Sequence, residues 1–66
     1  MYIIKGVSFA KKCKIINELK SVDINANVTI GGIEVYPDGK FQEKVLADFV
    51  RDNNLLMENA CIATAV

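Results

Sequence analysis

The first twenty-two residues change abruptly from a strand pattern to a helix pattern, and this change constrains the fold more than any other feature. Residues 2–7 are rich in β-branched and aromatic side chains and predict a strand. Ser8 is a good N-cap for an amphipathic helix over about residues 9–22, because its hydroxyl can accept a hydrogen bond from the first turn. A strand, a tight turn and a helix therefore follow one another at the start of the chain.

The rest of the chain continues this alternation. Residues 26–36 predict a β-hairpin, because Gly31-Gly32 lies between alternating apolar residues and glycine accepts the positive φ of a two-residue turn. Residues 40–53 carry apolar side chains at helical spacing and predict a second helix. Residues 60–66 predict a short last strand. Breaks between the elements are expected at Asp23-Ile24-Asn25, Pro37-Asp38-Gly39 and Asn53-Asn54.

The resulting order of elements is βαββαβ, which predicts an α+β, ferredoxin-like fold. In this fold a four-stranded antiparallel sheet carries two helices on one face, with the first and third strands central. We expect a single domain over residues 1–66, because a chain of this length has room for only one small core.

Alternation along the strands assigns side chains to the two faces of the predicted sheet. Gly6 is expected to lie in a bulge that returns Val7 to the core. The helix-covered face is expected to hold Tyr2, Ile4, Val28, Ile30, Ile33 and Val35. The open face is expected to show Ile3, Lys5, Asn27, Thr29, Glu34 and Tyr36. Such a mixed face is either a solvated surface or a binding or dimer surface.

The segment Gly6-Val7-Ser8, followed by a helix containing Ile16, Leu19 and Val22, resembles the heavy-metal-associated domain family of copper-chaperone-like modules. That resemblance implies a ferredoxin-like fold. The family binds its metal through two cysteines at the strand-to-helix turn, and Phe9 and Lys12 stand at those positions here. Neither side chain can replace a thiolate, so the chain looks like a degenerate member without the paired cysteines.

The two cysteines of the chain, Cys13 and Cys61, offer a different route to metal binding. Cys13 borders the apolar face of the first predicted helix, which favours a buried structural thiol. If the last strand runs beside the first, Cys61 could approach Cys13 and form a two-thiolate metal site or a disulfide. The spacing in the sequence leaves both readings open.

Four lysines at the start of the chain give a second candidate site. Lys12 falls near the middle of the apolar stripe of the first helix, where its stem can pack at the rim while the ammonium group reaches water. Alternatively, the lysines could bind an anion together with the free N–H groups of the helix start. The members of this cluster are Lys5, Lys11, Lys12 and Lys14.

Charge and residue types narrow the class of function. Eight basic and eight acidic residues give zero net charge, which argues against a nucleic-acid partner and against a membrane surface. The chain contains no histidine and no glycine-rich phosphate loop, so neither an enzyme nor a bound cofactor is expected. It has no secretory pattern and no apolar run of about 18 residues, which favours a cytoplasmic protein.

These observations predict a small non-enzymatic interaction module that binds a protein partner or associates with itself as a homodimer. The expected contact surface is the open sheet face or an exposed edge strand, whose backbone groups can extend a sheet. The candidate partner-binding residues are Ile3, Lys5, Lys12 and Tyr36. The alternative is a degenerate metal-handling protein that uses Cys13 and possibly Cys61.

Overall fold

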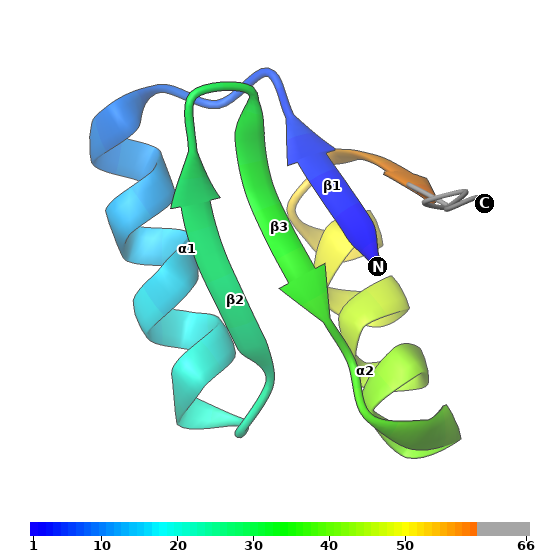
Figure 1. Cartoon of the computed structure of the whole chain (residues 1–66). Helices are drawn as coiled ribbons and strands as arrows, with labels where there is room; N and C mark the ends of the chain where they lie inside the picture. The colour runs from blue at the N-terminus through cyan, green and yellow to red at the C-terminus, as the bar shows by residue number, and fades with distance from the viewer. Residues whose placement is uncertain (60–66) are drawn as a thin grey trace, which may run out of the picture.

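The computed structural model describes residues 1–59, which form six elements in the predicted order (Figure 1). The elements are β1 (Tyr2–Lys5), α1 (Phe9–Ser21), β2 (Asn25–Thr29), β3 (Gly32–Tyr36), α2 (Gly39–Asp52) and β4 (Leu56–Asn59). The predicted α+β fold is therefore confirmed. The fourth strand begins directly after the α2 stop, at Leu56, whereas the strand predicted over residues 60–66 lies outside the described residues.

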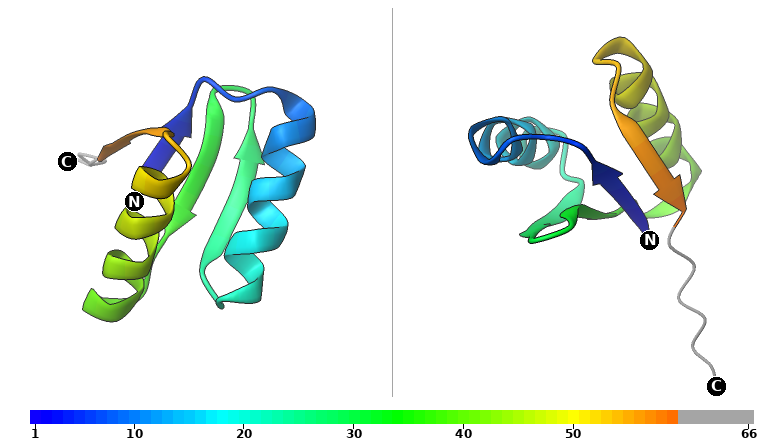
Figure 2. Two further views of the ribbon diagram at one scale, coloured as in Figure 1. Left: turned by 180° about the vertical axis from the view of Figure 1, so that it is seen from behind. Right: turned by 90° about the horizontal axis from the view of Figure 1, so that it is seen from above.

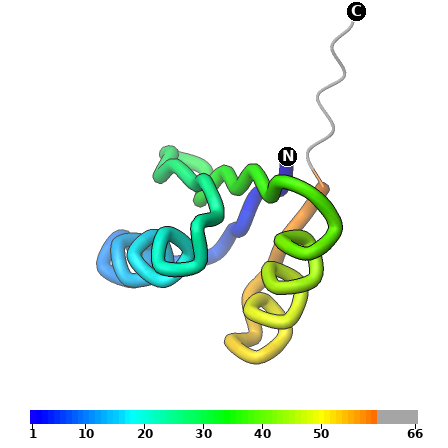
Figure 3. Tube along the Cα trace, turned by 90° about the horizontal axis from the view of Figure 1, so that it is seen from below, coloured from blue at the N-terminus to red at the C-terminus, as the bar shows by residue number. Residues whose placement is uncertain are grey.

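The four strands form one antiparallel sheet in the order β2-β3-β1-β4, with β1 and β3 at its centre as predicted. Both helices lie on the same face of the sheet, which is turned toward the reader in the left view of Figure 2. Figure 3 shows the helices standing apart, α1 beside β2 and α2 beside β4. Within the described residues no helix is long and apolar enough to cross a membrane.

The register of the strands places the core on the helix-covered face. Ile4 pairs with Ile33, and Val35 pairs with both Tyr2 and Ala26. Alternation then turns these side chains toward the helices. The buried core consists of Ile4, Ile15, Leu19, Ile24, Ala26, Ile33, Val35 and Leu46. Only one of these residues belongs to α2, so the second helix is anchored mainly by partly buried side chains.

The connection between β2 and β3 differs from the predicted glycine pair. Thr29 pairs with Gly32, so the two connecting residues are Ile30 and Gly31, and neither has a positive φ. Glycine is required at position 32 instead. Gly32 has a φ of +150°, and a Cβ there would overlap the carbonyl oxygen of Ile4. The prediction that Ile30 faces the core is wrong, because at the tip of the connection its side chain is fully exposed.

Val28 and the end of β1 also differ in detail from the predictions. Val28 pairs with Ile33 as expected for the core face, yet 41% of it is exposed because β2 is an edge strand. The first strand ends at Lys5, so the prediction of a bulge at Gly6 inside a strand over residues 2–7 is wrong. Gly6 turns the chain instead, with a φ of +74°. Val7 then packs, partly buried, against the core, as the predicted return of the chain requires.

Both helices end in the same hydrogen-bonded motif. After α1, the N–H of Ile24 donates to the carbonyl of Leu19, and Asp23 adopts a left-handed φ of +62°. After α2, the N–H of Leu55 donates to the carbonyl of Val50, and Asn54 has a φ of +54°. This is the Schellman motif, in which glycine is the usual left-handed residue. The helix stops predicted at Asp23 and Asn54 are thus confirmed.

One glutamine side chain joins the two halves of the fold. The Oε1 atom of Gln42 accepts a hydrogen bond of 2.8 Å from the N–H of Asp38, at the start of α2. Its Nε2 atom donates a bond of 3.0 Å to the carbonyl of Asp23, just past the end of α1. Gln42 therefore fixes the beginning of the second helix against the end of the first.

Candidate functional site: the open sheet face

The sheet face opposite the helices presents three of the four predicted partner-binding residues. Ile3 lies on central strand β1, where it pairs with Glu34 of β3 and Glu58 of β4. Lys5 pairs with Leu56, and Tyr36 pairs with Asn25 at the far end of β3. We call this surface, made of Ile3, Lys5, Asn25, Asn27, Thr29, Glu34, Tyr36, Leu56 and Glu58, the open face.

Two polar pairs occupy the open face. Lys5 Nζ lies 2.9 Å from Glu58 Oε1 in an exposed ion pair, a kind of contact that contributes little to stability. Tyr36 Oη donates a hydrogen bond of 2.7 Å to Glu34 Oε1. This hydrogen bond, with smaller effects of desolvation and of the Glu34 charge, raises the pKa of Tyr36 above its ordinary value of 10.0.

The apolar part of the open face is formed by Ile3, the Tyr36 ring and Leu56. Leu56 is 70% exposed, and Tyr36 is 39% exposed. The sequence prediction missed Leu56 and Glu58, because it placed the last strand over residues 60–66. The signal that could have found them is the short apolar run Leu55-Leu56-Met57, directly after the helix stop.

The fourth predicted partner-binding residue, Lys12, does not belong to the open face. Its Nζ atom donates a hydrogen bond of 2.8 Å to the carbonyl of Thr29, on the helix side of β2. Lys12 therefore lies apart from Ile3, Lys5 and Tyr36, and its part in partner binding stays a prediction. The reason is its place in the apolar stripe of α1, which carries the lysine stem over β2 and leaves the ammonium group at a strand end.

The same geometry separates the members of the predicted anion site. Lys5 is paired with Glu58 on the open face, while Lys12 is bonded to Thr29 on the other side of the sheet. Lys11 and Lys14 remain exposed on α1. Ser8 acts as the predicted N-cap, its Oγ accepting a bond of 3.3 Å from the N–H of Lys11.

The cysteine predictions are resolved only for Cys13. Its side chain is exposed and free, so the prediction of a buried structural thiol is wrong. Cys13 borders the apolar stripe of α1, but its side chain lies outside the contact between α1 and the sheet. Cys61 lies outside the described residues, and its distance from Cys13 stays a prediction. Among residues 1–59, no three His, Cys, Asp or Glu side chains gather into a metal site.

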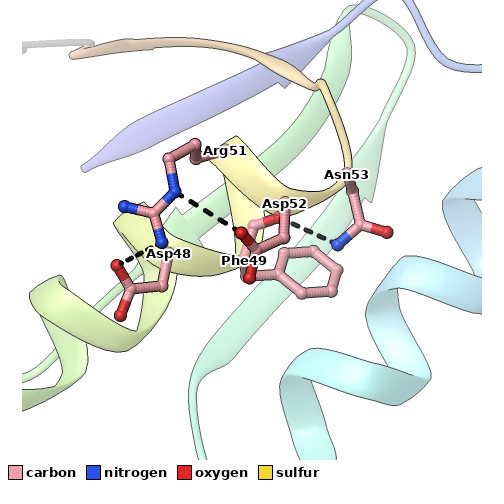
Figure 4. Close-up of polar contacts among 5 residues, drawn as sticks. All are labelled: Asp48, Phe49, Arg51, Asp52 and Asn53. Atoms are coloured by element: carbon pink, nitrogen blue, oxygen red, sulfur yellow. Dashed lines mark hydrogen bonds and ion pairs between the residues drawn. The ribbon is translucent and has the colours of Figure 1, made fainter.

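A charged cluster at the end of α2 was not predicted from the sequence (Figure 4). Arg51 contacts Asp48 at 3.2 Å and Asp52 at 3.4 Å; the side chains of Arg51 and Asp52 are largely exposed, and that of Asp48 is partly buried. Asn53 Nδ2 donates a bond of 2.8 Å to the carbonyl of Phe49. The Asn53 bond satisfies one carbonyl at the end of the helix, and Arg51 places a positive charge at the negative end of the helix dipole, so we assign these contacts to the helix terminus.

The described part of the chain encloses no pocket. Comparison with protein-family models, with curated proteins and with solved structures gave no match.

Proposed function

We propose that the protein is a small non-enzymatic interaction module that binds a protein, either a partner or a second copy, through the open face. The observation that carries this proposal is the apolar strip of Ile3, Tyr36 and Leu56 across the helix-free side of the sheet. Tyrosine is one of the residues that supply most of the binding energy at protein interfaces, and the two aliphatic side chains add apolar area beside it.

The polar pairs of the open face fit the same role. Lys5 and Glu58 neutralise each other, and Glu34 is held by the Tyr36 hydroxyl. A partner that covers the apolar strip can therefore leave these groups paired at its rim, where they keep access to water. Burying a charge without a partner would cost far more than the contact gains.

The edge of β4 adjoins this strip and supports the proposal further. β4 is an edge strand in the sheet order, and Leu56 projects from it on the open face. Edge strands offer backbone groups to which another chain can add a strand. At the other edge, α1 packs against β2 and Lys12 already binds the carbonyl of Thr29. The β4 edge is therefore the better place for strand addition.

The proposal is tested by comparing two exposed aromatic residues on opposite sides of the sheet. Tyr36→Ser removes an aromatic group from the open face, and Phe41→Ser removes an even more exposed one from α2. Sedimentation velocity over a range of concentrations measures self-association, and affinity capture followed by binding assays with the purified partner measures hetero-association. We expect Tyr36→Ser and Ile3→Thr to weaken binding by about tenfold or more, and Phe41→Ser to leave it unchanged.

A strictly monomeric protein whose Ile3→Thr and Tyr36→Ser variants keep every partner at full affinity would contradict the proposal. Circular dichroism of each variant, with a thermal melt, confirms that the comparison is made between folded proteins.

A metal-handling role is the second candidate, and the exposed thiol of Cys13 is the observation that favours it. The ferredoxin-like topology agrees with a distant relation to the heavy-metal-associated domains, which we propose as the origin of the fold. The positions of the family cysteines are taken by Phe9, which is exposed, and Lys12, which is bonded to Thr29. Titration of the reduced protein with Cu(I) or Zn(II) tests this role, because tight stoichiometric binding lost in Cys13→Ser would support it.

A further inference from the structure

The two helices are attached to the sheet unequally. α1 buries Ile15 and Leu19, and its backbone comes close to both β2 and β3. α2 buries Leu46 alone, and its backbone approaches neither β1 nor β3 as closely as α1 approaches β2. Figure 3 shows α2 standing apart from α1. The second helix is therefore held in place through its side chains, with Leu46 as its fully buried anchor.

The apolar face of α2 is only partly covered. Val45, Phe49 and Val50 pack against the core but stay partly exposed, and Phe41, one turn earlier, is 79% exposed. The free energy gained by docking a helix follows the apolar area that docking removes from water. Segments with few buried apolar contacts open at a lower free energy than the rest of the fold. By this measure α2 is the element with the weaker attachment of the two helices.

The strands on either side of α2 are held independently of it. β3 is paired on both sides, with β1 and with β2. β4 pairs with β1 over its whole length, from Leu56 opposite Lys5 to Asn59 opposite Tyr2. Movement of α2 away from the sheet therefore breaks no strand pairing, and both ends of the helix stay tethered.

Both connections of α2 contain residues suited to a hinge. Gly39, at the start of the helix, has a φ of +87° and open space where a Cβ would lie. Asn54, in the turn that leads to β4, has a φ of +54°. Hinges are formed by a few residues at the ends of elements that absorb changes of φ and ψ, and glycine and asparagine reach both signs of φ at low cost.

One polar contact connects α2 to the first half of the fold. Gln42 Nε2 donates a bond of 3.0 Å to the carbonyl of Asp23, just past the end of α1, and this bond is exposed. Water can therefore replace it when α2 moves away. The Oε1 atom of Gln42 accepts its bond from the N–H of Asp38, at the start of α2 itself, so that bond moves with the helix.

We infer that α2 is a hinged lid over the apolar face of the sheet, latched to the end of α1 by Gln42, which opens as one unit while the sheet and α1 stay folded. Opening withdraws Leu46 from the core and exposes apolar side chains of the sheet to water, so the open form is a minor state. The surface that it uncovers lies on the opposite side of the sheet from the open face. The lid is independent of the proposed binding at the open face.

Native-state hydrogen exchange of the full chain, followed amide by amide by NMR, tests the inference. We expect the inner amides of α2 to share one opening constant, larger by about tenfold or more than that of the amides in β1 and β3. Equal protection of α2 and the central strands would overturn the inference, because α2 would then open only with the whole fold. A steady decline of protection towards both ends of α2, with no shared value, would overturn it in favour of fraying.

Two variants that each remove one hydrogen bond sharpen this test. Gln42→Glu keeps the acceptor for Asp38 and removes the donor to Asp23, so exchange within α2 should rise by about fivefold. Lys12→Met removes the bond to Thr29, which persists when the lid opens. It should raise exchange in β1 and β3 by about fivefold and leave α2 unchanged.

Glu43→Gln, at the exposed position beside Gln42, is the matched control and should change neither set of amides. Acceleration of α2 by Lys12→Met to the same extent as β1 and β3 would overturn the inference, since it would couple α2 to global unfolding. Unchanged exchange of α2 in Gln42→Glu would overturn the assignment of Gln42 as the latch.

Discussion

The ammonium group of Lys12 donates a hydrogen bond of 2.8 Å to the main-chain carbonyl of Thr29 and so joins the first turns of α1 to the end of β2. The residues are seventeen positions apart in the sequence. The bond is partly buried, which strengthens it relative to a lysine contact in water. It explains why a lysine is accommodated within an otherwise apolar helix stripe.

Substitution of Lys12 by methionine should destabilise the protein by about 1 kcal/mol, because the stem is kept while the charged donor is lost. Lys11→Met, one residue away on an exposed position, is the matched control and should change stability by less than about 0.5 kcal/mol. Urea unfolding, monitored by circular dichroism, measures the free energy of unfolding of both variants. Equal effects of the two substitutions would show that the bond to Thr29 contributes nothing.

The adjacent glycines of the hairpin should respond very differently to alanine. Gly32→Ala places a methyl group against the carbonyl oxygen of Ile4 and forces alanine to a φ of +150°, so we expect a loss of about 3 kcal/mol or more. Gly31→Ala has open space around it and no positive φ, and its effect should stay within about 0.5 kcal/mol. Thermal melts of the two variants provide the comparison, and similar melting temperatures would contradict the close approach of β1 and β3.

Replacing Asp23 by glycine should stabilise the protein by about 0.5–1 kcal/mol. The change relieves a left-handed backbone and removes a negative charge from the C-terminal end of α1, which outweighs the greater freedom of glycine in the unfolded chain. Asn54→Gly should stabilise less, since asparagine carries no charge and tolerates this conformation. Asp23→Asn removes the charge alone and so separates the contribution of the charge from that of the left-handed backbone. Chemical denaturation measures the free energy of unfolding of all three variants.

The hydrogen bond between Tyr36 and Glu34 should be visible in the alkaline titration of the protein. It favours the neutral phenol, so the pKa of Tyr36 lies above 10.0 in the folded state. The stability that it contributes is therefore present below pH 10 and is lost as the pH rises through the folded-state pKa. In a Tyr2→Phe background, phenolate absorbance should show Glu34→Thr lowering the pKa of Tyr36 towards 10.0.

Glu58→Thr is the control for this titration, because Glu58 pairs with Lys5 and has no bond to Tyr36. It should leave the titration of Tyr36 in place. If Glu34→Thr left the midpoint of the Tyr36 titration unchanged, the hydroxyl of Tyr36 would not be bonded to Glu34 in solution.

The main features of the fold were predictable because they follow from local patterns. The cap at Ser8, the helix stops at Asp23 and Asn54, and the open-face positions of Ile3 and Tyr36 depend only on neighbouring residues or on strand alternation. The strand Leu56–Asn59 was not predicted because it is short and follows the helix stop at once. The strand predicted over residues 60–66, which carry more β-branched residues, lies outside the described residues. The hairpin was displaced by one residue because either glycine could satisfy a turn in isolation.

What the sequence by itself determined is the order of elements and the two faces of the sheet, since periodicity and capping are properties of the chain over a few residues. Tertiary structure alone decided which glycine was indispensable, because only the approach of Ile4 to Gly32 excludes a side chain there. It also decided that Lys12 binds Thr29 and that Ile30 stands in the solvent, since both depend on how α1 and the β2–β3 connection meet in space.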